Sequence, residues 1–401
     1  MHQLTALPRP VGKLLATLGH KLDRNLPGRY RGRIARFLGP QPGRYVSPDL
    51  GSKDALLAAF AKRGIRYAVI GGQSTVIPGV SDHLAIMVDD EDVNAARRMV
   101  TPWPAGEQIE AYSPSGLPGF AFGDMPLMPP RLARRLLDGA TPVDGINTVT
   151  PRDHFFATLF RLVYLRGLDS GIPAADASTP PSSVATAIAD QATQLGLALE
   201  KPITLESLDA FLATHDWQPP LDMLERIGCW NPWVADKLRK AGEWVGSEAP
   251  GLTVFYLRQR TMDEGKTDMV LDKLASSGFR LLPVPPLTPE QLADVTAEVR
   301  GGNWGRGPFP LSGGNPGAVY VAHDSAPIPP DAEALRQFPL LDNNRIQLAK
   351  QAVRDAVHAG LPRNQRYNAM HSTDNAVQAW RAVRELYPAL EPELRALTNG
   401  N

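Results

Sequence analysis

From Leu252 onward, short apolar runs alternate with amphipathic ones, and this order constrains the fold more than any other feature of the chain. Apolar runs bounded by turn residues are typical of strands, whereas a helical spacing of apolar residues that stops at Gly278 is typical of a helix. A strand, helix, strand unit followed by a helix and a strand is the order of a ferredoxin-like sheet. We therefore predict an α+β fold with strands at 253–258, 279–284 and 318–322.

A polar cluster follows near the C-terminus, where Asn368, His371 and Asp374 are preceded by Arg336 and Arg354. An unprotonated imidazole is nucleophilic at neutral pH. It can accept a phosphoryl group if arginines neutralise the phosphates and neighbouring groups orient the ring. The grouping therefore indicates phosphohistidine chemistry. The alternative is a surface histidine in a loop before a helix that Asp374 caps.

In order and spacing, residues 252–390 resemble the nucleoside diphosphate kinase family. The run Asn368-Ala-Met-His371 matches the signature that contains the family's phosphorylated histidine. The other matches are Arg258 at the strand-one lysine, Arg336 and Arg354 at the phosphate-binding arginines, and Asp342-Asn343 at a Thr-Asn pair.

The resemblance implies a nucleotide site with ATP or GTP as the phosphoryl donor and Mg²⁺ carried by the nucleotide. His371 would attack the terminal phosphoryl group, and Asn368 would brace the loop or a ligand hydroxyl. Trp304, in a glycine-rich loop, is the candidate base-stacking residue; its alternative role is to anchor that loop. The phosphates would be held by Arg258, Arg336 and Arg354, whose guanidinium groups form charge-assisted bidentate hydrogen bonds.

Departures of this chain from the family's pattern bear on whether the chain could transfer a phosphoryl group. The run Ser372-Thr373-Asp374-Asn375 stands where the family has Gly-Ser-Asp-Ser, and Ala382 replaces the glutamate that orients the imidazole. A neutral imidazole must be held in the right tautomer to attack, so loss of this acceptor disfavours transfer. The first interpretation is a nucleotide-binding, phosphotransferase-like protein. The alternative is a pseudoenzyme that binds a nucleotide or a phosphorylated polymer.

The first half of the chain contains a predicted helix, a strand that ends in Gly71-Gly72-Gln73-Ser74, and a return strand at 81–88. This order resembles the nucleotidyltransferase superfamily over residues 54–150. In that superfamily, glycine lets backbone amides approach a triphosphate. The resemblance implies nucleotide contacts at Gly71, Gly72 and Ser74.

That superfamily needs carboxylates at alternate positions of the return strand, because alternate residues share a face and can hold two magnesium ions together. These positions carry His83 and Ala85, and a shift that uses Asp82 brings Leu84 into the partner position. Asp144 is a third candidate carboxylate that cannot build the site alone. We therefore predict a degenerate module without protein metal ligands. An active nucleotidyltransferase is the second alternative.

With 401 residues, the chain is long enough for several domains with cores of their own. We predict a basic amphipathic leader at 1–44, a nucleotidyltransferase-like domain at 45–150, a helical region at 151–245 and a kinase-like domain at 246–401. Residues 11–38 combine an apolar helical face with many basic residues, so the leader could bind an anionic membrane surface or pack on the body.

The chain has 42 basic and 42 acidic residues, so no broad basic field favours nucleic acid. The single Cys229 excludes an internal disulfide, and no stretch is apolar enough to span a bilayer. We therefore expect a cytoplasmic protein whose partner is a nucleotide or another phosphorylated ligand. The oligomeric state stays open.

Overall fold

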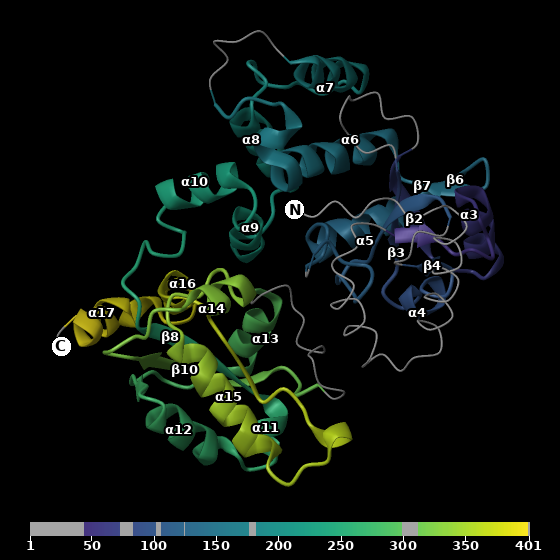
Figure 1. Cartoon of the computed structure of the whole chain (residues 1–401). Coiled ribbons are helices and arrows are strands. Elements are labelled where there is room, and N and C mark those ends of the chain that lie inside the picture. The colour runs from purple at the N-terminus through teal and green to yellow at the C-terminus, as the bar shows by residue number, and fades with distance from the viewer. Residues whose placement is uncertain are drawn as a thin grey trace. The chain divides into compact units, whose positions relative to one another are not determined.

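The computed structural model describes residues 44–72, 83–101, 106–123, 125–175, 182–298 and 312–399 (Figure 1). Residues 1–43 of the predicted leader lie outside this set, as do Ser74, Asp82 and Trp304. The chain combines helices and sheets, which confirms the predicted α+β class. It divides into two compact units, unit 1 at 1–220 and unit 2 at 221–401, and the helices predicted at 151–245 fall in both.

Unit 1 contains a seven-stranded mixed sheet in the order β4-β1-β5-β3-β2-β7-β6. Its strands are β1 (Arg44–Val46), β2 (Tyr67–Gly71), β3 (Leu84–Val88), β4 (Val100–Thr101), β5 (Gln108–Tyr112), β6 (Thr141–Val143) and β7 (Ile146–Thr148). The return strand β3 is antiparallel to β2, whereas β5 runs parallel to β3 and β7 runs parallel to β2. Every residue of β2 and β3 is buried, so these two strands form the centre of the unit.

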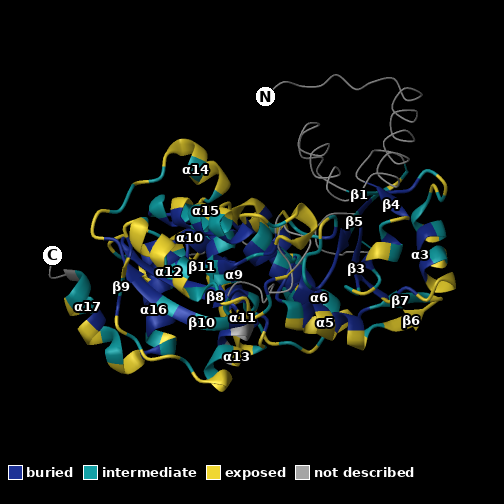
Figure 2. Cartoon of the chain, turned by 90° about the horizontal axis from the view of Figure 1, so that it is seen from below, coloured by how far each residue is buried: buried dark blue, intermediate teal, exposed yellow. Residues whose placement is uncertain are grey.

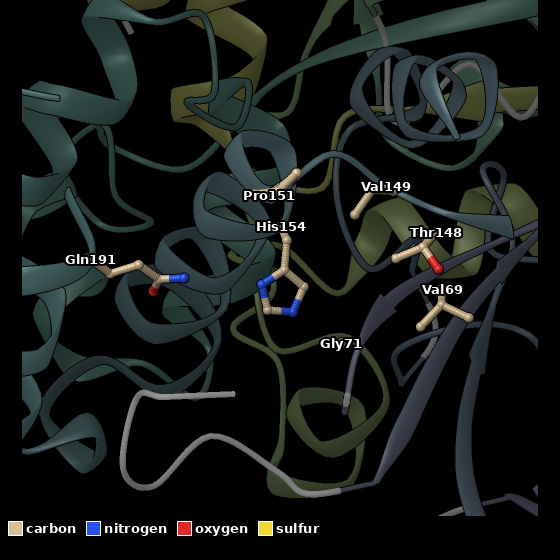
Figure 3. A pocket seen from close by; sticks show the side chains of 7 residues that line it. All are labelled: Val69, Gly71, Thr148, Val149, Pro151, His154 and Gln191. Carbon is tan, nitrogen blue, oxygen red and sulfur yellow. The ribbon is translucent and has the colours of Figure 1, made fainter. Parts of the chain in front are cut away.

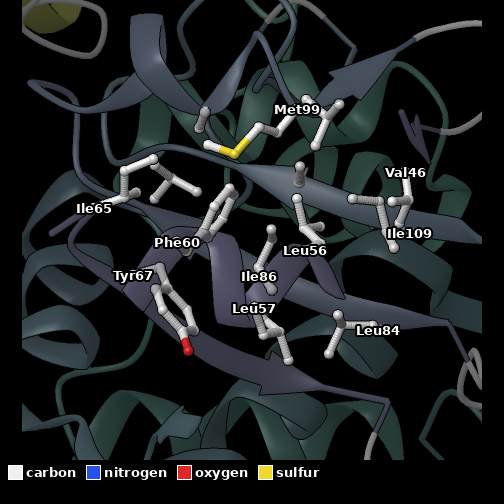
Figure 4. Packing of buried hydrophobic residues seen from close by; sticks show 14 of the residues in the cluster. Val46, Leu56, Leu57, Phe60, Ile65, Tyr67, Leu84, Ile86, Met99 and Ile109 are labelled. Atoms are coloured by element: carbon white, nitrogen blue, oxygen red, sulfur yellow. The ribbon is translucent and has the colours of Figure 1, made fainter. Parts of the chain in front are cut away.

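Helix α3 (Lys53–Lys62) packs its apolar face on this sheet (Figure 4). Ser52 caps the helix, and its Oγ accepts a hydrogen bond from the Ala55 amide at 3.2 Å. The ring of Phe60 lies edge-on to Tyr67 with centroids 5.4 Å apart. Full burial of such a side chain stabilises the fold by roughly 1.5–3 kcal/mol. The helix is therefore held mainly by its apolar face.

The other α-helices among the described residues of unit 1 are α4 (Val93–Ala96), α5 (Pro130–Gly139), α6 (Pro151–Phe160), α7 (Ser183–Gln194) and α8 (Leu205–Thr214). Thr150 caps α6, as its place before Pro151 predicts. Beyond its last residue, α6 continues as a π-helical turn at Arg161–Arg166. The Phe156 ring of α6 stacks on Trp217 at 5.3 Å, which attaches α6 to the segment after α8.

Unit 2 contains a four-stranded sheet in the order β11-β8-β10-β9, with every neighbouring pair antiparallel. Its strands are β8 (Leu252–Arg258), β9 (Arg280–Leu281), β10 (Pro316–His323) and β11 (Met370–Ser372). β9 is shorter than the predicted strand at 279–284. Proline has no N–H for a ladder hydrogen bond, and Pro283 and Pro285 lie two and four residues after the end of β9.

The two faces of this sheet bury different residues of β8. Phe255 and Leu257 lie on the α15 face, together with α12 (Thr267–Ser276) and α15 (Arg345–His358). Val254 and Tyr256 lie on the α16 face, together with α13 (Pro289–Glu298), α16 (Ala376–Leu386) and α17 (Glu391–Asn399). The remaining α-helices in the described part of unit 2 are α9 (Leu221–Gly228), α10 (Pro232–Lys240), α11 (Gln259–Asp263) and α14 (Ala332–Gln337). Most residues of α14 are exposed (Figure 2).

In the part of the chain that the structure describes, no helix has the length and apolar character needed to cross a membrane.

Candidate functional site

Three of the residues predicted for phosphate chemistry lie at the β8–β11 edge of unit 2. His371 stands opposite Tyr256 in the ladder, and their rings are 6.1 Å apart. The amide of Arg258 donates to the Ala369 carbonyl at 3.0 Å, so Arg258 is a diagonal neighbour of His371 on the α16 face. The structure therefore brings His371 and Arg258 to one face of the sheet.

Arg258 is held from several sides and is only 3% exposed. Its Nη1 donates to the Gly314 carbonyl at 2.9 Å. With its amide oriented to satisfy both groups, Asn368 accepts from Nη2 of Arg258 at 3.2 Å and donates to the Met370 carbonyl at 3.1 Å. Burial lowers the pKa of Arg258 to about 10, which leaves it charged at neutral pH. Arg258 and Asn368 therefore brace the loops around His371.

The other two predicted phosphate-binding arginines belong to helices of the opposite face. Arg354 lies on α15, and its Nη1 donates to Oε1 of Gln351 at 2.7 Å. Arg336 lies on the exposed α14, where its guanidinium pairs with Glu333 and its side chain is 68% exposed. α15 packs against Phe255 and Leu257, on one face of the sheet. His371 pairs with Tyr256, whose side chain lies on the other face. The helix that carries Arg354 is therefore not on the side of His371.

The residues around this edge have structural roles. Asp342 accepts a hydrogen bond from the Ala376 amide at 2.7 Å at the start of α16, and burial raises its pKa to about 6. Asn343 donates to Oδ2 of Asp324 at 2.9 Å. The cap of α16 is Asn375, whose Oδ1 accepts from the Gln378 amide, and not Asp374 as the alternative interpretation expected.

In unit 1, the backbone at Gly72, just after β2, passes very close to the backbone of His83. Gly72 has φ +84°, and a Cβ there would lie 2.1 Å from the His83 carbonyl oxygen. Only glycine fits this conformation and this space. Ala85, which occupies one of the two expected carboxylate positions, is fully buried and pairs with Gly71 on one side and with Glu110 on the other.

Glu110 is a candidate site residue that the sequence did not single out. It lies on β5 beside Ala85, and its Oε2 is 2.5 Å from Nη2 of Arg161 in the π-helical turn after α6. Asp144, named above as a third candidate carboxylate, lies in the β6–β7 turn at φ +50°, at the far edge of the sheet. The sequence did contain a sign of this strand, because polar and apolar residues alternate at 108–111 and this pattern places Glu110 on a strand.

Next to Gly71 is a cavity of about 170 Å³, lined by Val69, Gly71, Thr148, Val149, Pro151, His154 and Gln191. Figure 3 shows the His154 imidazole between the Gln191 side chain and the strand that carries Val69. Nε2 of His154 and Oε1 of Gln191 are buried and have no hydrogen-bond partner among the described residues. Burial, assisted by the charge of Arg161, lowers the pKa of His154, so the ring is neutral at pH 7.

Among the described residues, no group of three or more His, Cys, Asp or Glu side chains is placed to hold a metal ion.

Comparison of the chain with protein-family models, with curated proteins and with solved structures gives no match.

Proposed function

We propose that this protein is a nucleotide-binding pseudoenzyme whose ligand occupies the end of β2 in unit 1. One observation carries the proposal: the glycine turn at the end of β2 adjoins a cavity with two unsatisfied hydrogen-bonding groups. Buried polar atoms are normally paired, so Nε2 of His154 and Oε1 of Gln191 mark a place where a ligand or water completes the bonding. A nucleobase has flat apolar faces for Val69 and Val149 and polar edges for these two atoms.

The lack of a carboxylate pair supports binding without nucleotidyl transfer. Ala85 and His83 stand where transfer would require carboxylates, and Glu110 is engaged by Arg161. A single carboxylate already paired with a guanidinium is a poor ligand for two magnesium ions. This combination favours the pseudoenzyme over the nucleotidyltransferase alternative.

For unit 2 we infer a divergent ferredoxin-like domain of the nucleoside diphosphate kinase type. The antiparallel order β11-β8-β10-β9, with α12 and α15 on one face, supports this inference. Slow phosphoryl capture at His371 is the second candidate function. It is favoured by the partial exposure of His371 and by its position beside the charged Arg258. Ala382, buried on α16, supplies no acceptor to orient the ring.

The test is ATP binding, measured by calorimetry on the full chain, with Gln191→Leu as the diagnostic variant. We expect ATP to bind the wild type and the variant to lose affinity several-fold, because leucine keeps the volume but removes the amide. Gln194→Leu, at an exposed position of the same helix, is the matched control and should bind normally. The proposal would be contradicted if Gln191→Leu and Gln194→Leu bound ATP with equal affinity, or if the wild type bound neither ATP nor GTP.

Incubation with γ-labelled ATP separates the two candidate functions. The pseudoenzyme takes up no acid-labile, base-stable label. Label that disappears in His371→Ala would instead establish phosphohistidine capture in unit 2.

A further inference from the structure

The guanidinium of Arg161 has N–H donors that no described residue accepts from. Its only hydrogen bond among the described residues is the one from Nη2 to Glu110. An arginine side chain presents more N–H donors than one carboxylate oxygen can accept, and its planar fork suits phosphate. The side chain is 12% exposed, so part of it remains accessible.

Arg161 also lies at the glycine turn. Its Nη1 is 3.2 Å from the position that a Cβ on Gly71 would take. Because Gly71 has no side chain, the guanidinium reaches the backbone at the point where the cavity begins. The charge of Arg161, the glycine turn and the cavity therefore all adjoin Gly71.

The local backbone accounts for this placement. α6 changes to a π-helical turn at Arg161, and π turns are rare insertions that recur at functional sites. The extra residue in such a turn shifts the side chains that follow relative to a regular α-helix. In α6 itself, His154 reaches the cavity from nearly two turns earlier.

We propose that unit 1 binds a mononucleotide without a divalent cation, with Arg161 contacting the phosphate at Gly71 and the base entering the cavity beside His154 and Gln191. The inference rests on the proposed function and adds the charge that recognises the ligand. A guanidinium supplies the positive charge that metal-dependent sites take from magnesium, and it forms directed hydrogen bonds to phosphate oxygens. The neutral imidazole of His154 can bond a base edge without adding charge.

The experiment compares binding of AMP to the full chain in excess EDTA and in excess Mg²⁺. We expect the same affinity in both conditions, because no step depends on a bound cation. Arg161→Gln should weaken binding about tenfold or more, as expected for loss of a hydrogen bond to a charged group. Arg135→Gln, another partly exposed arginine of unit 1, is the matched control and should leave the affinity unchanged.

Glu110→Gln gives the sharpest discrimination. If Arg161 receives the phosphate, removal of the competing negative charge should tighten AMP binding several-fold. If Glu110 is a metal ligand, the same variant should lose Mg²⁺-dependent binding, and the inference is overturned. Binding of AMP that needs Mg²⁺, or an Arg161→Gln variant with wild-type affinity and a wild-type circular dichroism spectrum, would overturn it as well. Nucleotide binding that survives in Arg161→Gln but fails in Gln191→Leu would leave the proposed function intact.

Discussion

At the residue scale, Glu225 of α9 is a buried titratable group of unit 2. Its carboxylate is 1% exposed and accepts hydrogen bonds from Nε2 of Gln378 at 2.9 Å and from Nη2 of Arg381 at 3.1 Å. Burial raises the pKa of Glu225 to about 7, against the opposing effect of Arg381. A buried carboxylate with a raised pKa makes the fold sensitive to pH near neutrality.

The sign of this sensitivity follows from proton linkage. Between pH 4.5 and about 7, the folded state holds a proton on Glu225 that the unfolded state releases. The stability that Glu225 contributes is therefore full below pH 4.5 and is lost as the pH rises through 7. At about 1.4 kcal/mol for each pKa unit, the shift from 4.5 to about 7 corresponds to a loss of at most about 3–4 kcal/mol. We expect hydrogen exchange of α16 amides, corrected for intrinsic rates, to show this decline in protection.

Glu225→Gln should remove that decline, because glutamine keeps the hydrogen-bond acceptor and does not titrate. Glu393→Gln, at an exposed position of α17, serves as the control and should leave the slope unchanged. A Glu225→Gln variant with the same pH slope as the wild type would show that Arg381 keeps Glu225 charged.

At the element scale, the loop before β10 closes on the end of β8. A Cβ on Gly313 would lie 2.0 Å from the Asn368 carbonyl oxygen and 2.7 Å from Cδ of Arg258. The Asn368 backbone and the buried Arg258 side chain can move aside only at a cost in folding free energy. The absence of a side chain at Gly313 therefore allows β8, β11 and this loop to meet around Arg258.

Gly313→Ala should destabilise unit 2 by about 1–3 kcal/mol, the usual cost of forcing atoms into a packed interior. Faster hydrogen exchange of β8 and β11 amides would report the change. Gly139→Ala is the matched control, because a Cβ there meets only Oδ2 of Asp153, at 3.9 Å. Unchanged exchange in Gly313→Ala would mean that the loop is free to withdraw from Arg258.

At the scale of the whole molecule, the structure places the domain boundary before α9. Arg381 of α16 pairs with Glu225 of α9 at 3.1 Å and with Glu243, beyond α10, at 2.8 Å. Arg384 of α16 also pairs with Glu243, at 3.3 Å. These ion pairs join the α9–α10 segment to the kinase-like domain predicted at 246–401, and both belong to unit 2.

A fragment of residues 221–401 should therefore fold cooperatively, and a fragment of residues 246–401 should have a lower unfolding midpoint. The shorter fragment lacks Glu225 and Glu243, so Arg381 and Arg384 lose these partners, and the apolar residues of α9 and α10 are lost as well. Urea titrations monitored by near-ultraviolet dichroism would compare the two. Equal midpoints would place the boundary at residue 246 instead.

The sequence by itself determined the elements and their local chemistry. Apolar periodicity located β8 and β10 within a few residues, and the glycine pair at the end of β2 marked a tight turn. These features depend on neighbours in the chain, because helix and strand periods and backbone sterics are local. The same locality explains why the α+β class could be predicted from one sequence.

Only the tertiary structure decided which residues meet. The order of the strands placed Glu110 beside Ala85 and left Asp144 at the far edge. The packing of α15 put the helix that carries Arg354 on the face opposite His371, although the resemblance read from the sequence had predicted both at one phosphate site. Periodicity shows that a residue is buried against something, but long-range strand pairing and helix packing determine what that partner is, and residues far apart in the chain carry no local signal of it.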